Sequence, residues 1–240
     1  MNRIALDVVR PTGTTPLEFE PRRMINAGYV GRDQAAVRHH IEELQREGVA
    51  PPSSVPTLYP VPISGLTTAS RIEVVEGQTS GEIEFVLLVQ SNRLLVGIGS
   101  DHTDRSLEKL DVLKSKQACP NVMGNAVWDY EDIRGHWDLL QLQSSVRSST
   151  ADNWTPYQIA TVASILAPEQ ILDLVRKRLP DQNIDRTIIF SGTIPLLDGK
   201  MSYASQFQCA LIDPVLQRSL HCSYDVVDLN DLLTEPLSAK

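Results

Sequence analysis

Two apolar segments separated by a short polar one constrain the fold of this chain more than any other feature of its sequence. Residues 83–89 and residues 94–99 are rich in β-branched, aromatic and leucine side chains, and Gln90-Ser91-Asn92-Arg93 lies between them. Apolar runs of this length on either side of a polar tetrapeptide are typical of two antiparallel strands joined by a hairpin loop. The sequence therefore predicts a β-hairpin near the middle of the chain.

If this hairpin forms, three carboxylates are expected to lie together on one face of its two strands. Glu82 and Glu84 alternate with the apolar residues of the first strand, so they share a face and lie about 6.5–7 Å apart. If Val89 pairs with Leu94, Asp101 on the second strand lies opposite Glu82, with Cβ atoms about 5 Å apart. The prediction depends on this register, because a slip of one residue would turn Asp101 to the other face.

Two interpretations of these carboxylates remain open. A solvated sheet face accounts for Glu82 and Glu84, because exposed charged residues are common. It explains less well why like charges would lie opposite each other, which is unfavourable. A divalent cation would remove the conflict, and ligands that are all oxygen favour Mg²⁺, Mn²⁺ or Ca²⁺ over zinc or copper. Three protein ligands would leave positions open for water and substrate.

The rest of the chain predicts an α+β fold in a single domain that spans residues 1–240. An amphipathic helix is expected over residues 33–47, another after Arg105, and one or two more over residues 156–179, with Pro168 opening the second. Strands do not alternate regularly with these helices, which argues against a doubly wound α/β fold. A polar loop, either a mobile lid or a linker, is expected at residues 144–153, and a proline-rich connector at residues 51–62. Further strands are expected at residues 72–75, 187–190, 207–212 and 223–227.

Charge and composition exclude several classes of function. Acidic residues outnumber basic ones by 30 to 22, and no run of Lys or Arg is present, so nucleic acids and anionic membranes are not expected partners. No apolar run is long enough to cross a bilayer. Cys119, Cys209 and Cys222 are odd in number and lack a C-x-x-C spacing, which favours reduced thiols and a cytoplasmic protein. Motifs for nucleotide binding or serine hydrolases are absent from the sequence.

Two short motifs surround the predicted carboxylate cluster: Gly81-Glu82-Ile83-Glu84, and then Ser100-Asp101-His102-Thr103-Asp104-Arg105. Through these motifs the sequence resembles the fumarylacetoacetase-like superfamily, in a branch catalogued as a domain of unknown function. The resemblance implies a mixed β-sheet roll or sandwich of the fumarylacetoacetase C-terminal domain type, with peripheral helices, and a homodimer. It also implies that Glu82, Glu84 and Asp101 hold the metal, Mg²⁺ or Mn²⁺ with Ca²⁺ as a third candidate.

The same resemblance implies three further site residues. Lys116 corresponds to a lysine that lines the active site, although the Asp that usually follows it is not evident. Thr193, in Ser191-Gly192-Thr193-Ile194-Pro195, corresponds to a threonine that contacts substrate, although Ile194 is inserted before the proline. Arg105 corresponds to the arginine of the second motif. It would either bind a substrate carboxylate or act as an ion-pair partner for Asp104 or another nearby acid.

A His-x-x-Glu pair in a segment that closes over the site is the last implied element, and the chain offers two. On the helix that carries Val37 and Ile41, His40 lies about 70° from the centre of the apolar face and His39 lies nearly opposite that face. His40 can therefore approach the interior, and His39 should face water. This geometry selects His40 and Glu43, which are i, i+3 neighbours, as the catalytic pair. Two exposed histidines on a surface helix are the alternative.

The resemblance implies an enzyme that acts on a 2-oxo acid or a 1,3-dicarbonyl compound through a metal-stabilised enolate. Hydrolysis of a C–C bond in an acylpyruvate-like substrate is the leading expectation. Decarboxylation, hydration and keto–enol isomerisation on the same scaffold are alternatives, because the fold and the metal do not fix the reaction. A non-catalytic module that binds a small molecule is a further hypothesis, and an unrelated α+β protein with a solvated acidic face is the last.

Overall fold

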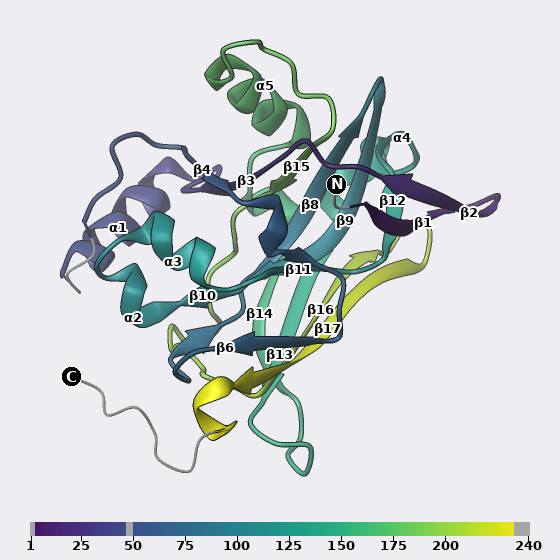
Figure 1. The fold of residues 1–240 in the computed structure, drawn as a ribbon. Coiled ribbons are helices and arrows are strands. Elements are labelled where there is room, and N and C mark those ends of the chain that lie inside the picture. Colours follow the sequence, from purple (N-terminus) through teal and green to yellow (C-terminus); the bar gives the residue numbers. More distant parts are fainter. Residues whose placement is uncertain (1–2, 47–49, 233–240) are drawn as a thin grey trace.

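The computed structural model describes residues 3–46 and 50–232, except for the side chains of residues 40, 43 and 44. Within this part of the chain, two mixed β-sheets form most of the fold, and the helices lie around them (Figure 1). Strand pairs β1/β12, β15/β3 and β17/β6 are parallel, whereas the central pair β8/β9 is antiparallel. The predicted α+β class is confirmed.

The larger sheet runs in the order β2 (Gly13–Phe19), β1 (Ile4–Arg10), β12 (Ala126–Asp129), β9 (Arg93–Asp101), β8 (Ile83–Gln90), β15 (Thr187–Phe190), β3 (Arg23–Gly28) and β4 (Thr57–Val61), while β11 (Asn121–Met123) pairs with β9 and with β5 (Leu66–Thr67). The second sheet runs in the order β14 (Thr155–Thr161), β13 (Gln141–Arg147), β16 (Gln206–Asp213), β17 (Arg218–Asp228) and β6 (Arg71–Val74). A two-stranded ladder joins β7 (Thr79–Ser80) to β10 (Thr103–Asp104).

The helices are mostly short. The α-helices are α1 (Gln34–Arg46), α2 (Arg105–Glu108), α3 (Val112–Ala118), α4 (Tyr130–Ile133) and α5 (Pro168–Arg178), and the 3₁₀ helices are η1 (Ile63–Gly65), η2 (Arg134–Leu139), η3 (Val162–Ser164) and η4 (Leu229–Leu232). None of the helices in the described residues is long and apolar enough to span a membrane.

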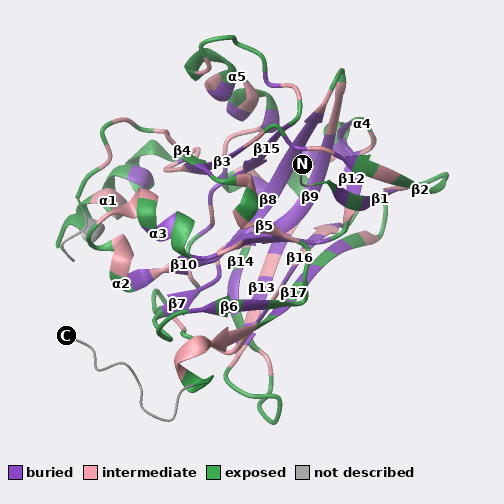
Figure 2. Cartoon of the chain, viewed as in Figure 1, coloured by how far each residue is buried: buried purple, intermediate pink, exposed green. Residues whose placement is uncertain are grey.

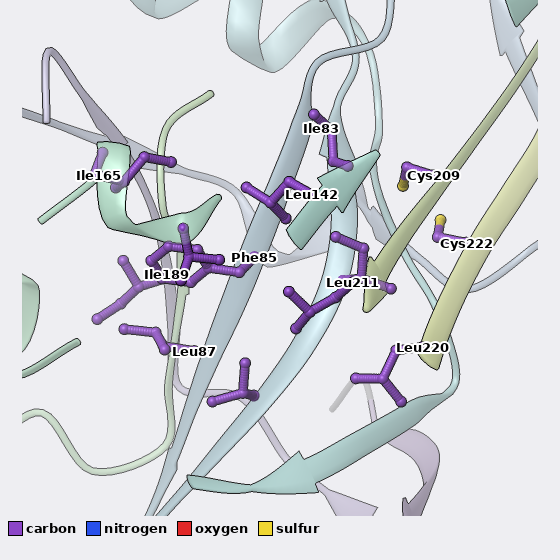
Figure 3. Close-up of a cluster of buried hydrophobic side chains, with 14 of the residues drawn as sticks. Ile83, Phe85, Leu87, Leu142, Ile165, Ile189, Cys209, Leu211, Leu220 and Cys222 are labelled. Carbon is purple, nitrogen blue, oxygen red and sulfur yellow. The ribbon is translucent and has the colours of Figure 1, made fainter. Parts of the chain in front are cut away.

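Strand β8 is buried on both faces, which explains why its sequence reads as a nearly continuous apolar run. Phe85 and Leu87 belong to a core cluster that also contains residues of the second sheet, such as Leu142 and Leu211 (Figure 3). Val86 and its neighbours on the opposite face belong to another cluster, which the N-terminal strand β1 covers. Figure 2 shows the two central strands as buried along most of their length. Glu84 and Asp101 are buried as well, and Glu82 is only partly exposed, so the interpretation of the acidic face as solvated is wrong.

Several expected elements are confirmed. Helix α1 matches the amphipathic helix expected at residues 33–47, and α5 begins at Pro168. Strands β8, β9, β15, β16 and β17 cover the expected strand segments, and β6 covers the expected segment 72–75 except for Val75. The three cysteines are free and buried.

Three expectations about secondary structure are wrong. Residues 156–161 form strand β14 rather than a helix, because they pair along β13 and bury Tyr157 and Gln158. Residues 144–147 belong to β13, so the expected polar loop starts later. The single helix expected after Arg105 is split into α2 and α3, because the Asp111 side chain accepts a hydrogen bond from the Lys114 amide and starts a new helix there.

Candidate metal centre

The β8/β9 hairpin brings together the three carboxylates that the sequence singles out. Val89 pairs with Leu94, as predicted, and the Asp101 amide donates to the Glu82 carbonyl at 3.2 Å. One carboxylate oxygen from each of Glu82, Glu84 and Asp101 lies within 4.8 Å of the others. Glu84 is 1% exposed and Asp101 is fully buried, whereas the Glu82 side chain retains 16% exposure. The cluster is therefore open to solvent mainly at Glu82.

Two glycines lie next to Glu84 at positions that have no space for a side chain. The Gly192 amide donates to Glu84 Oε2 at 2.9 Å, and Gly192 has a φ of +84°. A Cβ at Gly192 would lie 2.8 Å from the Ala27 carbonyl oxygen. Gly99 pairs with Glu84 across the hairpin, and a Cβ there would lie 2.5 Å from the Val122 carbonyl oxygen. Neither position tolerates a side chain without a backbone shift.

Lys116 on helix α3 compensates the buried charge. Its ammonium group forms an ion pair with Asp101 Oδ2 and lies 3.8 Å from Glu82 Oε2. Burial alone would lower the pKa of Lys116, but Asp101 and then Glu82 raise it above its ordinary value. Burial, followed by the charge of Asp101, raises the pKa of Glu84 well above its ordinary value. Burial likewise raises the pKa of Asp101, against the opposing effect of Lys116.

The donor set fits a hard divalent cation. Asp101 Oδ1 is buried and has no hydrogen-bond partner among the described residues, which is costly for a carboxylate oxygen. A cation among the three carboxylates would satisfy this oxygen and would compensate the negative charges on Glu82 and Glu84. Oxygen ligands of this kind suit Mg²⁺, Mn²⁺ or Ca²⁺.

Arg105 donates hydrogen bonds through two of its guanidinium nitrogens, and the third, Nη2, forms an ion pair without a hydrogen bond among the described residues. Nε donates to Ser80 Oγ at 2.7 Å, Nη1 donates to Glu108 Oε2 at 2.8 Å, and Nη2 lies 3.0 Å from Glu82 Oε1. Asp104 instead caps helix α2 by accepting from the Leu107 amide. Of the two roles considered for Arg105, the structure thus shows an ion-pair partner for nearby acids.

Thr193 lies beside the metal-ligand strand, but its hydroxyl group is occupied. Its Oγ1 donates to the Ile83 carbonyl at 2.9 Å and accepts from Gln158 Nε2 at 2.8 Å. Gln158 is fully buried, and its Oε1 accepts from the Ile83 amide at 3.0 Å. Gln158 therefore ties β14 to the residue between the two glutamates. No sequence pattern marked this glutamine, because the residues that it contacts are far away along the chain.

Two tyrosines complete the surroundings of the carboxylates, and sequence reasoning missed both. The Lys116 ammonium lies 5.8 Å from the centre of the Tyr59 ring, and Tyr59 belongs to β4, within the segment expected to be a connector. Burial raises the pKa of Tyr29 to about 12, and the neighbouring Tyr59 and Glu108 add to this rise. The phenol groups therefore stay protonated and offer neutral hydrogen-bond donors.

The histidines have different roles. His40 and Glu43 belong by their backbone to α1, but their side chains lie outside the described residues; His39 is exposed, as expected. His102 is buried next to Asp101 in sequence, and its ring nitrogens contact Thr79 Oγ1 at 2.9 Å and Tyr224 Oη at 3.0 Å. Burial and then Arg105 lower the pKa of His102 to about 3, so this imidazole is neutral and holds neighbouring strands together.

Comparison of the whole fold with solved structures gives several matches at low sequence identity. A crystal structure of Cg1458 has a TM-score of 0.62 at 13% identity and covers 95% of this chain and 100% of that one. The 2-keto-3-deoxy-D-arabinonate dehydratase complexed with magnesium and 2,5-dioxopentanoate has a TM-score of 0.59 at 16% identity, with coverages of 91% and 78%. Fumarylacetoacetate hydrolase from psychrophilic Exiguobacterium antarcticum has a TM-score of 0.56 at 14% identity, with coverages of 92% and 83%.

These likenesses establish a shared fold, of the type that the sequence resemblance implied. A search of curated proteins by sequence found no match. A scan against protein families matches residues 27–224, a span that contains the carboxylate cluster and the elements that hold it. The matched family is described as "Protein of unknown function (DUF2848)", and the chain belongs to this family.

Proposed function

We propose that this protein is a metal-dependent enzyme that acts on a 2-oxo acid or a 1,3-dicarbonyl compound, with hydrolysis of a C–C bond as the leading reaction. Glu82, Glu84 and Asp101 would hold Mg²⁺ or Mn²⁺. The observation that carries the proposal is the buried carboxylate cluster with an unpartnered oxygen on Asp101. The shared fold adds support, because a dehydratase with this fold was crystallised with magnesium and 2,5-dioxopentanoate.

The cation would chelate two neighbouring oxygens of the substrate and stabilise the enolate that forms as a C–C or C–H bond breaks. The protein groups around it have separate tasks. Lys116 keeps a positive charge beside Asp101 and would offset negative charge that develops on the substrate. Arg105 holds Glu82 in place, and the Gly192 amide orients Glu84. Rigid placement of this kind is what electrostatic catalysis requires, because no reorganisation is then needed during the reaction.

His40 is our candidate for the general base, with Glu43 orienting its imidazole. Imidazole titrates near neutral pH, so His40 could take a proton from water or from the substrate. The carboxylate of Glu43 would stabilise the resulting imidazolium. Thr193 stays a candidate for substrate binding, and its hydroxyl would have to leave the Ile83 carbonyl to donate to a substrate.

Hydration, decarboxylation and isomerisation share the enolate with hydrolysis and differ in the group that attacks or leaves. A direct assay separates these reactions, because each gives a different product from acylpyruvates or oxaloacetate. We expect turnover by metal-loaded wild-type protein and a loss of at least a hundredfold in kcat for His40→Ala, in keeping with the usual contribution of a general base. Unchanged turnover in His40→Ala would remove His40 from the mechanism.

The metal site itself is tested by thermal unfolding of chelated protein titrated separately with Mg²⁺, Mn²⁺ and Ca²⁺. A ligand that binds only the folded state raises its stability, so a saturable rise in Tm is expected. Glu84→Gln should abolish this rise and still fold, because the raised pKa of Glu84 favours a neutral side chain there in the absence of metal.

Glu20→Gln is the matched control for the metal titration. Glu20 pairs with Arg186 at 3.0 Å, and the Arg186 amide donates to Val89, at the far end of β8 from Glu82. This variant loses the same charge and should respond to metal as the wild type does. No change in Tm with any of the three cations, in folded wild-type protein, would refute the proposed function.

A further inference from the structure

Glu108 is a fourth carboxylate at this site, and it is not one of the three proposed metal ligands. It belongs to helix α2, one turn after Arg105, and accepts a hydrogen bond from Arg105 Nη1 at 2.8 Å. Its side chain keeps 20% exposure, whereas the Arg105 side chain keeps 5%. Glu108 is therefore the more exposed member of its ion pair with Arg105.

The described residues leave no cation of the site unpaired. Arg105 faces the carboxylates of Glu82 and Glu108, and Lys116 faces those of Asp101 and Glu82. The site thus contains two positive and four negative side chains. One bound divalent cation would make the number of positive charges equal to the number of negative charges. With the metal bound, the side chains that the structure describes at this site would carry no excess positive charge for a second acidic group of a substrate.

Two tyrosines among the described residues also lie near Glu108. The charge of Glu108 reaches Tyr29 and Tyr59, whose pKa values are raised first by burial and further by this carboxylate. Phenol rings offer apolar surface and neutral hydrogen-bond donors to a ligand, but no positive charge. They suit a chemical group that is uncharged.

We propose that Glu108 is a specificity-determining residue that selects 2-oxo acids with an uncharged far end and rejects those with a second carboxylate. This inference rests on the proposed function, since the metal would hold the 2-oxo acid end of the substrate. Glu108 acts in two ways: it occupies Arg105, which would otherwise attract a carboxylate, and it repels that carboxylate directly. Specificity of this kind arises from a repulsive element built against the wrong ligand.

Glu108→Gln tests the inference with an isosteric change. The glutamine oxygen can still accept from Arg105, but the negative charge is gone. The probes are oxaloacetate and its 4-methyl ester, which share the chelating end and differ in the charge of the far carboxyl group. Dissociation constants for both, measured by calorimetry with the Mg²⁺-loaded protein, give a preference ratio that does not depend on turnover. Where turnover occurs, kcat/KM gives a second ratio, and the change should lie in KM.

We expect the wild type to prefer the ester and Glu108→Gln to shift the ratio by at least tenfold toward oxaloacetate. Glu20→Gln, which removes one charge at the far end of β8, should leave the ratio unchanged. A ratio that is equal in wild type and Glu108→Gln overturns the inference. If Glu108→Gln loses affinity for both compounds by the same factor, Glu108 has a structural role, and this outcome also overturns the proposal.

The metal titration distinguishes this failure from failure of the proposed function. If Mg²⁺ stabilises the protein and the ester binds, but the ratio does not move, only the role of Glu108 is wrong. If Mg²⁺ stabilises the protein and neither compound binds to wild type or to Glu108→Gln, 2-oxo acids are not the ligands and both proposals about substrate fail. If no cation binds, the proposed function fails first.

Discussion

At the scale of the residue, the buried ammonium group of Lys116 is held in place by carboxylates that would be unstable without it. Lys116→Met keeps most of the volume and removes the charge. Breaking a buried ion pair costs about 3–5 kcal/mol, because the remaining charge loses its compensation. We expect Lys116→Met to lower the free energy of unfolding of metal-free protein by about this amount, measured by urea denaturation.

Lys114→Met is the control on the same helix. The Lys114 side chain is 72% exposed and pairs with Asp111 at 3.1 Å, so its loss should cost less than about 1 kcal/mol. Added Mg²⁺ should restore part of the stability of Lys116→Met, because it supplies positive charge beside Asp101. Equal stability of the two variants would show that Lys116 does not compensate the cluster.

The pH dependence of metal binding also belongs to this scale. Burial raises the pKa values of Glu84 and Asp101 above their ordinary values, 4.5 and 3.8. Their contribution to the stability of metal-free protein is therefore fully present below these ordinary values and is lost as the pH rises through the raised ones. Metal binding requires the ionised forms, so the increase in Tm caused by Mg²⁺ should grow as the pH rises from 5 to 8.

Thermal unfolding with and without Mg²⁺ at each pH checks this expectation, together with calorimetry in buffers of different ionisation enthalpy, which should reveal proton release. In Glu84→Gln, metal binding should be lost at every pH. A metal-induced change in Tm that stays constant between pH 5 and pH 8 would contradict the raised pKa values.

Among single residues, the sequence was sufficient to predict the position of those that follow a rule about nearby residues in the chain. The alternation of side chains along one strand placed Glu82 and Glu84 together, and the hairpin register added Asp101. The supporting contacts obey no such rule. Gly192 reaches Glu84 across 108 positions of sequence, and Gln158 reaches Ile83 across 75. Such contacts are set by the packing of whole sheets, which a local pattern does not specify.

At the scale of the element, the same distinction explains which strands were predictable. β8 and β9 are apolar because they are central strands buried on both faces. β13 and β14 contain polar residues that look like a loop or a helix in sequence. Ser144 and Gln158 are nevertheless buried. Their burial is tolerated because Ser144 Oγ donates a hydrogen bond to Gln158 Oε1 at 3.2 Å, so these polar groups have partners inside the sheet. Tertiary hydrogen bonding here overrides local propensity.

Gln158→Leu tests how much the junction between β14 and β8 depends on this amide. The substitution leaves the Ile83 amide without its side-chain acceptor and the Ile194 carbonyl with only a 3.5 Å contact from Thr193 Oγ1. Each buried group left unpaired costs about 1–3 kcal/mol, so we expect a loss of about 2–5 kcal/mol in the free energy of unfolding. Affinity for Mg²⁺ should fall as well, because Ile83 lies between two of the proposed ligands.

The control is Gln143→Leu on the neighbouring strand. Gln143 is half-buried on β13 and donates to the Gln141 side chain at 3.3 Å, so its replacement should change stability by less than about 1 kcal/mol. Urea denaturation and a Mg²⁺ titration of the two variants give the comparison. If Gln158→Leu binds Mg²⁺ as tightly as Gln143→Leu does, the junction does not position the carboxylates.

At the scale of the whole molecule, the two sheets share one apolar core. Phe85 of β8 and Leu142 of β13 belong to the same cluster of buried residues, with Leu211 of β16 (Figure 3). Strands from both halves of the sequence also alternate in the larger sheet, where β15 lies between β8 and β3. Neither sheet could keep its inner face buried if the other unfolded. The single domain that the sequence predicts thus stays a prediction, and cooperative unfolding is its test.

We therefore expect residues 1–240 to unfold in one cooperative transition. Far-UV circular dichroism reports on both sheets, whereas tryptophan fluorescence reports on Trp128 and Trp137, which are buried in the shared core, and on the half-buried Trp154. In a urea titration the two signals should have the same midpoint, because all-or-none unfolding makes different probes coincide. Saturating Mg²⁺ should move both midpoints upward by the same amount, since the proposed ligands lie on the central hairpin. Separate midpoints, or a midpoint that moves with Mg²⁺ in only one signal, would instead mean that the sheets are stabilised independently and that the metal centre belongs to one of them alone.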